Sequence, residues 1–158
     1  MALLKNINSY VSVIEADFYF ENRIDATAWT EASETQKEQA LITATANLDN
    51  MNWTGVAISE TQNLAFPRVG TYFDPKLGIE VSFTEEIPSR IKVAVYEMAY
   101  HLLNNDGLLD STGDVKSIHV GAIKLIDIQS SSKTPHVVMS SIKPMLVNGG
   151  ANLWWRAN

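Results

Sequence analysis

Two segments of the chain begin with a helix-capping box and continue with apolar residues at helical spacing, which limits the fold more than any other feature. The capping pairs are Ser12 with Glu15 and Ser33 with Gln36. In a capping box each side chain accepts a hydrogen bond from the backbone of the other residue, so N–H groups of the first turn are satisfied. Behind each pair, apolar residues recur at steps of three and four. We therefore expect two helices, over 12–22 and 34–51.

A third apolar stripe follows Pro88, which suits the first turn of a helix because that turn needs no N–H donor there. Apolar side chains from Ile91 to Leu102 fall on one face of such a helix. The pattern predicts a helix over 88–104 that ends near Asp106-Gly107.

The segment from Val56 to Gly78 lacks this periodicity and is rich in proline and glycine. Long connections of this kind are usually irregular, and their own side chains must hold them in place. We expect the aromatic residues Phe66, Tyr72 and Phe73 to hold this segment.

The chain after residue 115 combines strand, turn and helix signals. Two β-rich runs flank Gly121 and predict a hairpin at about 115–128. A short amphipathic helix over 137–146, interrupted by Pro144, is expected to follow.

At 158 residues the chain can bury one sizeable core and has little length for a second. The expected fold is mainly α (α+β): a helical bundle of three to four helices with a β-hairpin. Residues 1–147 would form this domain, and residues 148–158 would form an extended C-terminal tail.

The chain contains no cysteine, which excludes disulfides, thiolate metal sites and a cysteine nucleophile. No N-terminal apolar run is long enough for a signal peptide, and no later segment approaches a membrane span. We expect a protein made in the cytoplasm, kept there or in a particle assembled there, with no membrane partner.

The net charge of −6 conceals a gradient along the chain. Residues 1–51 hold three basic against eight acidic residues, and residues 52–114 hold four against nine. Residues 115–158 reverse this, with five basic residues against Asp127 alone. An overall acidic chain argues against general nucleic-acid binding, but the basic section could face DNA or an acidic surface of a second subunit.

Residues that could perform chemistry do not form a recognisable site. His101, His119 and His136 are not spaced with one another, or with carboxylates, as metal ligands on one element usually are. The chain has neither a Gly-rich phosphate loop nor a nucleophile elbow. We expect no enzymatic activity, no metal and no cofactor.

Two short segments are candidates for specific contacts. Phe66 and Pro67 can lock a loop onto the helices, and Arg68 can reach a carboxylate or carbonyl groups. These three residues form either a loop anchor within one subunit or a subunit contact. The second segment follows a Gly-Gly hinge and contains large apolar and cationic side chains that are typical of interface hot spots, namely Leu153, Trp154, Trp155 and Arg156.

Four motifs stand in the order and spacing of one family: NSYVSVIEADFYF at 8–20, KEQALITATANLD at 37–49, QNLAFPR at 62–68 and EIPSRIKVAVYEMA at 86–99. Together they resemble the phage proteins labelled DnaT-like single-stranded-DNA-binding proteins, and the likeness runs nearly end to end. The chain departs from that pattern at Phe66, where the family more often has tryptophan, at Ala122, where proline is common, and in its Trp-rich C-terminus.

The resemblance implies a head-to-tail adaptor, or head-completion protein, of a tailed bacteriophage. That family's genes belong to virion-assembly modules, and its fold resembles head-tail connector proteins. We therefore expect a homo-oligomeric ring, a dodecamer, that sits on the portal in the virion neck and extends the DNA channel. Genomic double-stranded DNA would pass through without specific binding, and a downstream tail or neck protein would attach.

On this reading, the predicted hairpin supplies a contact or channel-lining arm through Lys116, His119 and Lys124. The C-terminal tail would dock on the portal or a neighbour, or fold back on its own domain. The alternative is a DnaT-like replication accessory that binds single-stranded DNA, which needs a basic groove with exposed aromatic residues. The C-terminal section, with its five basic residues and two tryptophans, comes nearest to that requirement.

Overall fold

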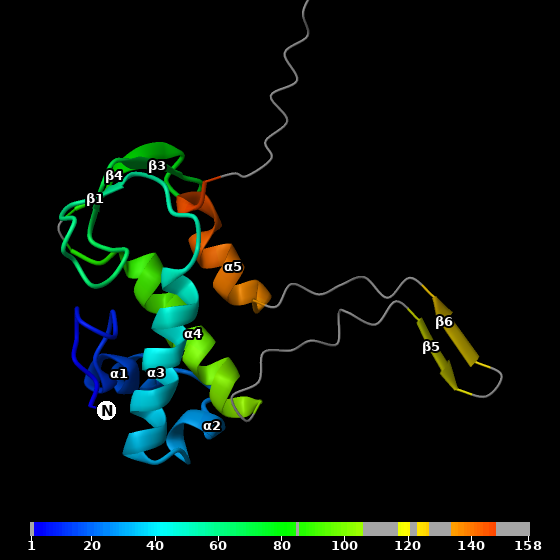
Figure 1. Ribbon diagram of the computed structural model, residues 1–158. Helices are drawn as coiled ribbons and strands as arrows, with labels where there is room; N and C mark the ends of the chain where they lie inside the picture. The colour runs from blue at the N-terminus through cyan, green and yellow to red at the C-terminus, as the bar shows by residue number, and fades with distance from the viewer. Residues whose placement is uncertain (1, 85, 106–116, 121–122, 127–133, 148–158) are drawn as a thin grey trace, which may run out of the picture.

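The computed structural model describes residues 2–84, 86–105, 117–120, 123–126 and 134–147. Within these residues the chain forms α-helices α1 (Val13–Glu21), α2 (Thr27–Thr30), α3 (Glu34–Asp49), α4 (Ser89–Asn104) and α5 (His136–Ile142). Helices α3 and α4 pack along each other, and α5 packs on α4 (Figure 1). The predicted mixed α and β fold class is confirmed.

The local signals in the sequence explain where the long helices begin. Ser12 and Ser33 both form complete capping boxes with the residue three positions later. Pro88 and Pro135 occupy the N-cap positions of α4 and α5, and Pro144 lies in a short 3₁₀-helix, Lys143–Met145, that follows α5. The helices predicted over 12–22, 34–51, 88–104 and 137–146 are therefore confirmed, with small shifts at their ends.

Helix α2 was not expected from the sequence, because four residues are too short to show a period. It is held by Trp29, whose side chain is 1% exposed and stacks on Phe20 with ring centroids 4.7 Å apart. The indole Nε1 donates a hydrogen bond to Asp17 Oδ1 over 2.8 Å, so the buried polar atom has a partner.

The expectation of an irregular connection from Val56 to Gly78 holds for residues 58–67, which form neither helix nor strand, and is wrong for the remainder. This region and the residues just after it form two antiparallel ribbons from strands β1 (Val56–Ala57), β2 (Arg68–Val69), β3 (Thr71–Asp74) and β4 (Ile79–Ser82). The two ribbons meet where Gly55 and Gly70, both at positive φ, face each other. A Cβ on Gly70 would lie 2.9 Å from Gly55 Cα, so only glycine permits this approach.

The hairpin predicted at 115–128 is confirmed as strands β5 (Ser117–Val120) and β6 (Ile123–Ile126), which pair antiparallel. The side chains of these strands are not described. The expected tail, residues 148–158, lies outside the described residues.

The core is a cluster of buried apolar side chains from all five helices and from the loop that precedes β2. The largest fully buried members come from the helices, from the segment before α1 and from the 3₁₀-helix, and are Tyr10, Trp29, Leu41, Leu48, Ile91, Met98, Ile142 and Met145. The core thus joins the first half of the chain to residues near 145.

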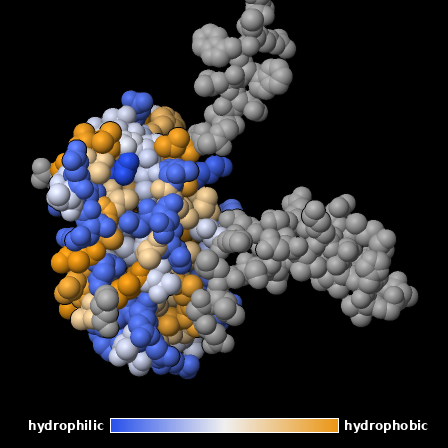
Figure 2. Space-filling model, viewed as in Figure 1, coloured by the Kyte–Doolittle hydropathy of each residue, from blue (hydrophilic) through white to orange (hydrophobic). Residues whose placement is uncertain are grey.

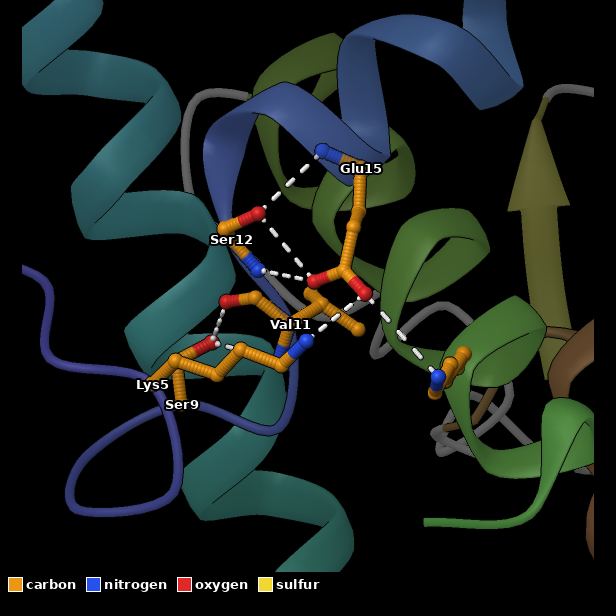
Figure 3. Close-up of polar contacts among 6 residues, drawn as sticks. Lys5, Ser9, Val11, Ser12 and Glu15 are labelled. Atoms are coloured by element: carbon orange, nitrogen blue, oxygen red, sulfur yellow. Dashed lines mark hydrogen bonds and ion pairs between the residues drawn. The ribbon is translucent and has the colours of Figure 1, made fainter. Parts of the chain in front are cut away.

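Glu15 connects three parts of the fold at the edge of this core (Figure 3). Its carboxylate accepts hydrogen bonds from Ser12 N and Lys5 Nζ, over 2.9 and 2.7 Å, and Lys92 Nζ of α4 lies 3.9 Å away. Partial burial opposes ionisation of Glu15, but the bonds from Lys5 and Ser12 outweigh it and hold its pKa below the usual value. The N-terminal loop, α1 and α4 are therefore joined by a single carboxylate.

Candidate nucleic-acid interface

Phe66 lies inside the subunit, where its ring is 2% exposed. It packs edge-on against Tyr10, Trp53 and Phe83, with ring centroids 6.3, 5.1 and 5.4 Å away. The peptide bond between Phe66 and Pro67 is cis. These contacts are those of a loop anchor, and a contact with a second subunit stays a prediction.

Arg68 binds backbone carbonyl groups of its own loop. Its Nε donates to Thr54 O over 2.8 Å, and its Nη2 donates to Gly55 O over 2.6 Å. Its Nη1 donates to Ala65 O over 3.2 Å. The guanidinium thus ties the segment after α3 to the start of β2, and its hydrogen-bond partners among the described residues are carbonyl groups, not carboxylates.

The other predicted contact residues are only partly within the described chain. His119 on β5 and Lys124 on β6 are cross-strand Cα partners, although their side chains are not described. Lys116 and the tail residues Leu153, Trp154, Trp155 and Arg156 lie outside the described residues. Their proposed contacts stay predictions.

Among the aromatic residues expected to hold the 56–78 segment, Phe73 behaves differently from Phe66 and Tyr72. Tyr72 stacks on Phe83, with centroids 5.2 Å apart. Phe73 is 56% exposed and points to the opposite face of β3, because neighbouring side chains alternate along a strand. The expectation for Phe73 is therefore wrong, and its ring is available for an external contact.

The tip of the β3–β4 ribbon, which follows Phe73 in the chain, carries an exposed lysine and an exposed leucine. Asp74 O accepts hydrogen bonds from Leu77 N and Gly78 N, which closes the turn, and Gly78 adopts the positive φ that the turn requires. Lys76 and Leu77 are exposed on that turn. Figure 2 shows apolar patches among hydrophilic residues at this end of the molecule.

Arg90 joins the tip to α4. Its Nε and Nη2 donate to Asp74 Oδ2 and Oδ1 over 3.0 and 2.6 Å, a bidentate pair. The bonds from Arg90 hold the pKa of Asp74 below its usual value, and Lys76 N also donates to Asp74 Oδ1. Two of the five guanidinium N–H groups are used in this pair, and a further side-chain hydrogen bond joins Arg90 to Tyr72.

A shallow cleft of about 370 Å³ lies between the ribbon tip, the start of α4 and the end of α5. Lys76, Ser89, Arg90 and Ser141 line it together with Asp74. The N-cap of α4 is Pro88, which has no side-chain acceptor, so the first-turn N–H groups of this 16-residue helix are not capped by it. The cleft therefore combines two cations, two hydroxyl groups and a helix N-terminus.

Two of the lysines in the described part of the chain, Lys76 and Lys143, have no carboxylate within ion-pair distance among the described residues. Both lie at this end, since the 3₁₀-helix that contains Lys143 packs on β3. By contrast, Lys5, Arg23, Lys37 and Arg90 all pair with carboxylates. The two lysines without a carboxylate partner in the described residues thus lie at the ribbon end, which also carries Glu80 on β4.

Other kinds of site find little support in the residues that the structure describes. They contain no group of three or more His, Asp or Glu side chains that could hold a metal ion. None of the helices formed by these residues is long and apolar enough to cross a membrane.

The fold and this cleft define a small α+β protein with a basic, aromatic ribbon tip. The family model described as "Putative DnaT-like ssDNA binding protein" matches residues 2–157, and the chain belongs to that family. No curated protein and no solved structure matches the chain.

The family match corrects the functional reading of the sequence. Its description names single-stranded-DNA binding, so the head-to-tail adaptor, the dodecameric ring on the portal and the location in the virion neck are wrong. The portal, a downstream tail or neck protein and double-stranded DNA that passes without binding are likewise wrong as partners.

Sequence reasoning missed the cleft residues Asp74, Lys76, Ser89 and Arg90. Asp74, Pro75 and Gly78 are typical residues of a tight turn, and such a turn that carries a lysine close to an aromatic residue is the signal that could have identified the tip.

Proposed function

We propose that the protein binds single-stranded DNA through the tip of the β3–β4 ribbon and the start of α4. The observation that carries this proposal is the family match over residues 2–157, whose description names that ligand. The proposed role is binding, without a chemical step, and it assigns no metal or cofactor to the chain.

The cleft supplies groups that suit a phosphate. Lys76 gives positive charge, and the hydroxyl of Ser89 and the N-terminus of α4 give further donors beside the Arg90–Asp74 pair. Asp74 is already neutralised by Arg90, which reduces its repulsion of a phosphate.

Phe73 supplies the surface for a base. Proteins that bind single strands without sequence preference combine a positive groove with aromatic rings on which bases stack. Phe73 lies one residue before the turn that carries Lys76, on the opposite face of the ribbon from Asp74 and the cleft. A single strand that places a base on its ring and a phosphate at the lysine must therefore pass over the tip of the ribbon. Glu80 is the cross-strand partner of Phe73, so we place the phosphate on the Lys76 side of the ring.

The test is fluorescence anisotropy of a labelled oligo-dT with wild type, Phe73→Ala and Phe18→Ala. Loss of one stacked base costs about 1–3 kcal/mol, so Phe73→Ala should weaken binding roughly fivefold or more. Phe18→Ala is the matched control, because Phe18 is also a largely exposed phenylalanine but lies on α1, away from the cleft. Equal losses in both variants, or no loss in Phe73→Ala, would contradict the proposed interface.

A further inference from the structure

A second open cleft, of about 650 Å³, lies where α1, α4 and α5 meet. Residues that line it include Tyr19, Arg23, Glu97 and Val137. Glu97 is only 8% exposed, although its carboxylate borders this cleft. A charged side chain that is so well buried beside an open cleft is a candidate for ligand recognition.

The second cleft and the cleft at the ribbon tip lie along one face of the α4–α5 pair (Figure 1). Arg90 and Val93 line the cleft at the tip, and Glu97, four residues further along α4, lines the second cleft. On α5, Ser141 lines the first cleft and Val137, four residues earlier, lines the second. Residues three or four apart share one face of a helix. The seven residues from Arg90 to Glu97 rise about 10 Å, so one strand can reach both clefts.

Glu97 has one carboxylate oxygen that accepts hydrogen bonds within the fold and one that does not. Oε1 accepts from Tyr19 Oη and from Arg23 Nη1, both over 2.6 Å. Oε2 accepts no hydrogen bond from any residue that the structure describes. An ionised carboxylate can only accept, and a largely buried acceptor is stabilised when it meets a donor. A ligand of this cleft is therefore expected to offer an N–H group to Oε2.

Arg23 places donors beside that acceptor. Its guanidinium carbon lies 4.7 Å from the centre of the Tyr100 ring, and this contact and the pair with Glu97 together fix its position. Its Nε and Nη2 have no hydrogen-bond partner in the part of the chain that the structure describes. The cleft thus presents one acceptor next to a group with several remaining donors. The opposite charges of the pair also cancel, so Glu97 does not add net repulsion of a nucleic acid.

Among the bases of DNA, cytosine matches this pattern best. Its pairing edge carries an amino donor, N4, followed by two acceptors, N3 and O2, and glutamate is a recurrent acceptor for N4. Guanine presents two donor groups on that edge and would need two acceptors. Adenine has one acceptor beside its amino group, which leaves a donor of Arg23 unused. Thymine places the carbonyl oxygen O4 where cytosine has its amino group, so that oxygen would face Glu97 Oε2.

We propose that the second cleft binds a cytosine of the bound single strand. Glu97 Oε2 accepts from N4 of the base, and the guanidinium of Arg23 donates to N3 and O2. This inference rests on the proposed function and adds a sequence preference to it: the ribbon tip binds any strand, and the second cleft favours cytosine over thymine. Phe18 borders the second cleft as well, but oligo-dT contains no cytosine, so the Phe18→Ala control with that strand is unaffected.

The test is fluorescence anisotropy with two labelled strands of equal length, oligo-dT and the same strand with its central thymines replaced by cytosines. The wild type should bind the cytosine strand about fivefold more tightly, which is the discrimination of one good base contact. A third strand, with N4,N4-dimethylcytosine at the same positions, lacks the amino donor and should bind no better than oligo-dT. This comparison needs no variant protein.

Glu97→Gln tests the acceptor directly. The amide keeps Oε1 for Tyr19 and Arg23 and replaces Oε2 by a donor that suits O4 of thymine. The variant should therefore bind oligo-dT at least as tightly as the cytosine strand, a reversal that loss of folding cannot produce. Glu21→Gln is the matched control, because it removes the same charge from an exposed glutamate of α1 that lines the neighbouring cleft and not this one. It should keep the preference for cytosine.

Three results would overturn the inference: equal binding of the oligo-dT and cytosine strands by the wild type, a dimethylated strand that binds as well as the cytosine strand, or an unchanged preference in Glu97→Gln. Tight binding of oligo-dT without any preference for cytosine overturns this inference alone. Absence of binding to every strand overturns the proposed function together with it.

Discussion

Arg90 and Asp74 connect the first turn of α4 to the tip of the β3–β4 ribbon through two hydrogen bonds of 3.0 and 2.6 Å. Asp74 also closes the turn that displays Lys76, through its backbone carbonyl and its carboxylate. The pair therefore determines both the position of the ribbon and the geometry of the cleft.

Replacing Arg90 should affect folding and DNA binding together. Arg90→Lys removes the bidentate geometry, which a single ammonium group cannot reproduce, and leaves Asp74 less well paired. We expect a lower thermal midpoint by circular dichroism and weaker oligo-dT binding. Asp74→Asn is the control: it should also lower the midpoint, but it removes a negative charge from the cleft and should not weaken DNA binding. If Asp74→Asn loses as much DNA affinity as Arg90→Lys, the cleft does not contact phosphate.

The same pair predicts a dependence of stability on acid. Hydrogen bonds from Arg90 lower the pKa of Asp74 below its usual 3.8. Its contribution to stability is therefore present above that pH and is lost as the pH falls through the lower, folded value. Urea unfolding of wild type and Asp74→Asn should differ at neutral pH, and the difference should shrink below pH 3.8. A difference that persists unchanged in acid would rule out ionisation of Asp74 as its source.

Burial raises the pKa of four of the five tyrosines, Tyr10, Tyr19, Tyr96 and Tyr100, which should therefore titrate late in alkali. Burial, together with the hydrogen bond from Tyr19 Oη to Glu97 Oε1, raises the pKa of Tyr19 to about 12. Burial raises the pKa of Tyr96 to about 12 as well. Because the folded state favours the neutral phenols, this stabilisation is complete below pH 10 and is lost as the pH rises from 10 towards 12. Phenolate absorbance should show these late groups in the wild type, and Tyr19→Phe should remove one. Titration of all five tyrosines near pH 10 in a folded sample would contradict the network.

Phe66 should be a major source of stability. Truncation of a buried phenylalanine costs about 3–5 kcal/mol, since it removes apolar contacts and leaves a cavity. Phe66→Ala should lose about that free energy of unfolding in urea titrations. Phe73→Ala, a truncation of an exposed ring in the same region, should lose little. If Phe66→Ala loses less than about 1 kcal/mol of unfolding free energy, far below the expected loss, this ring does not anchor the loop.

The helices could be predicted because their start signals are local. Ser12 with Glu15, Ser33 with Gln36 and Pro88 are each recognisable within a few residues, and the structure confirms all three helix starts. Two-residue strands such as β1 and β2 have no alternation to detect, and their pairing depends on the contact between Gly55 and Gly70.

The candidate interface was harder to predict because it depends on contacts between distant segments. Asp74 and Arg90 are 16 residues apart, and nothing in the sequence pairs that carboxylate with that arginine. The side of β3 on which Phe73 lies follows from strand register, which could not be assigned while the segment was expected to be irregular. Composition was also misleading, because a net charge of −6 argues against nucleic-acid binding. The net charge does not show that Lys76 and Lys143, which have no carboxylate partner among the described residues, both lie at the end of the molecule that carries the β3–β4 ribbon.

The most direct test of the central claim is the salt dependence of oligo-dT binding by the wild-type protein, with duplex DNA of equal length as the comparison. If Lys76, Arg90 and Lys143 each meet a phosphate, the logarithm of the binding constant should fall against the logarithm of salt with a slope of about −2. Binding should be saturable and stronger for the single strand than for the duplex. Absence of saturable binding at low salt, or a stronger preference for duplex, would contradict the account.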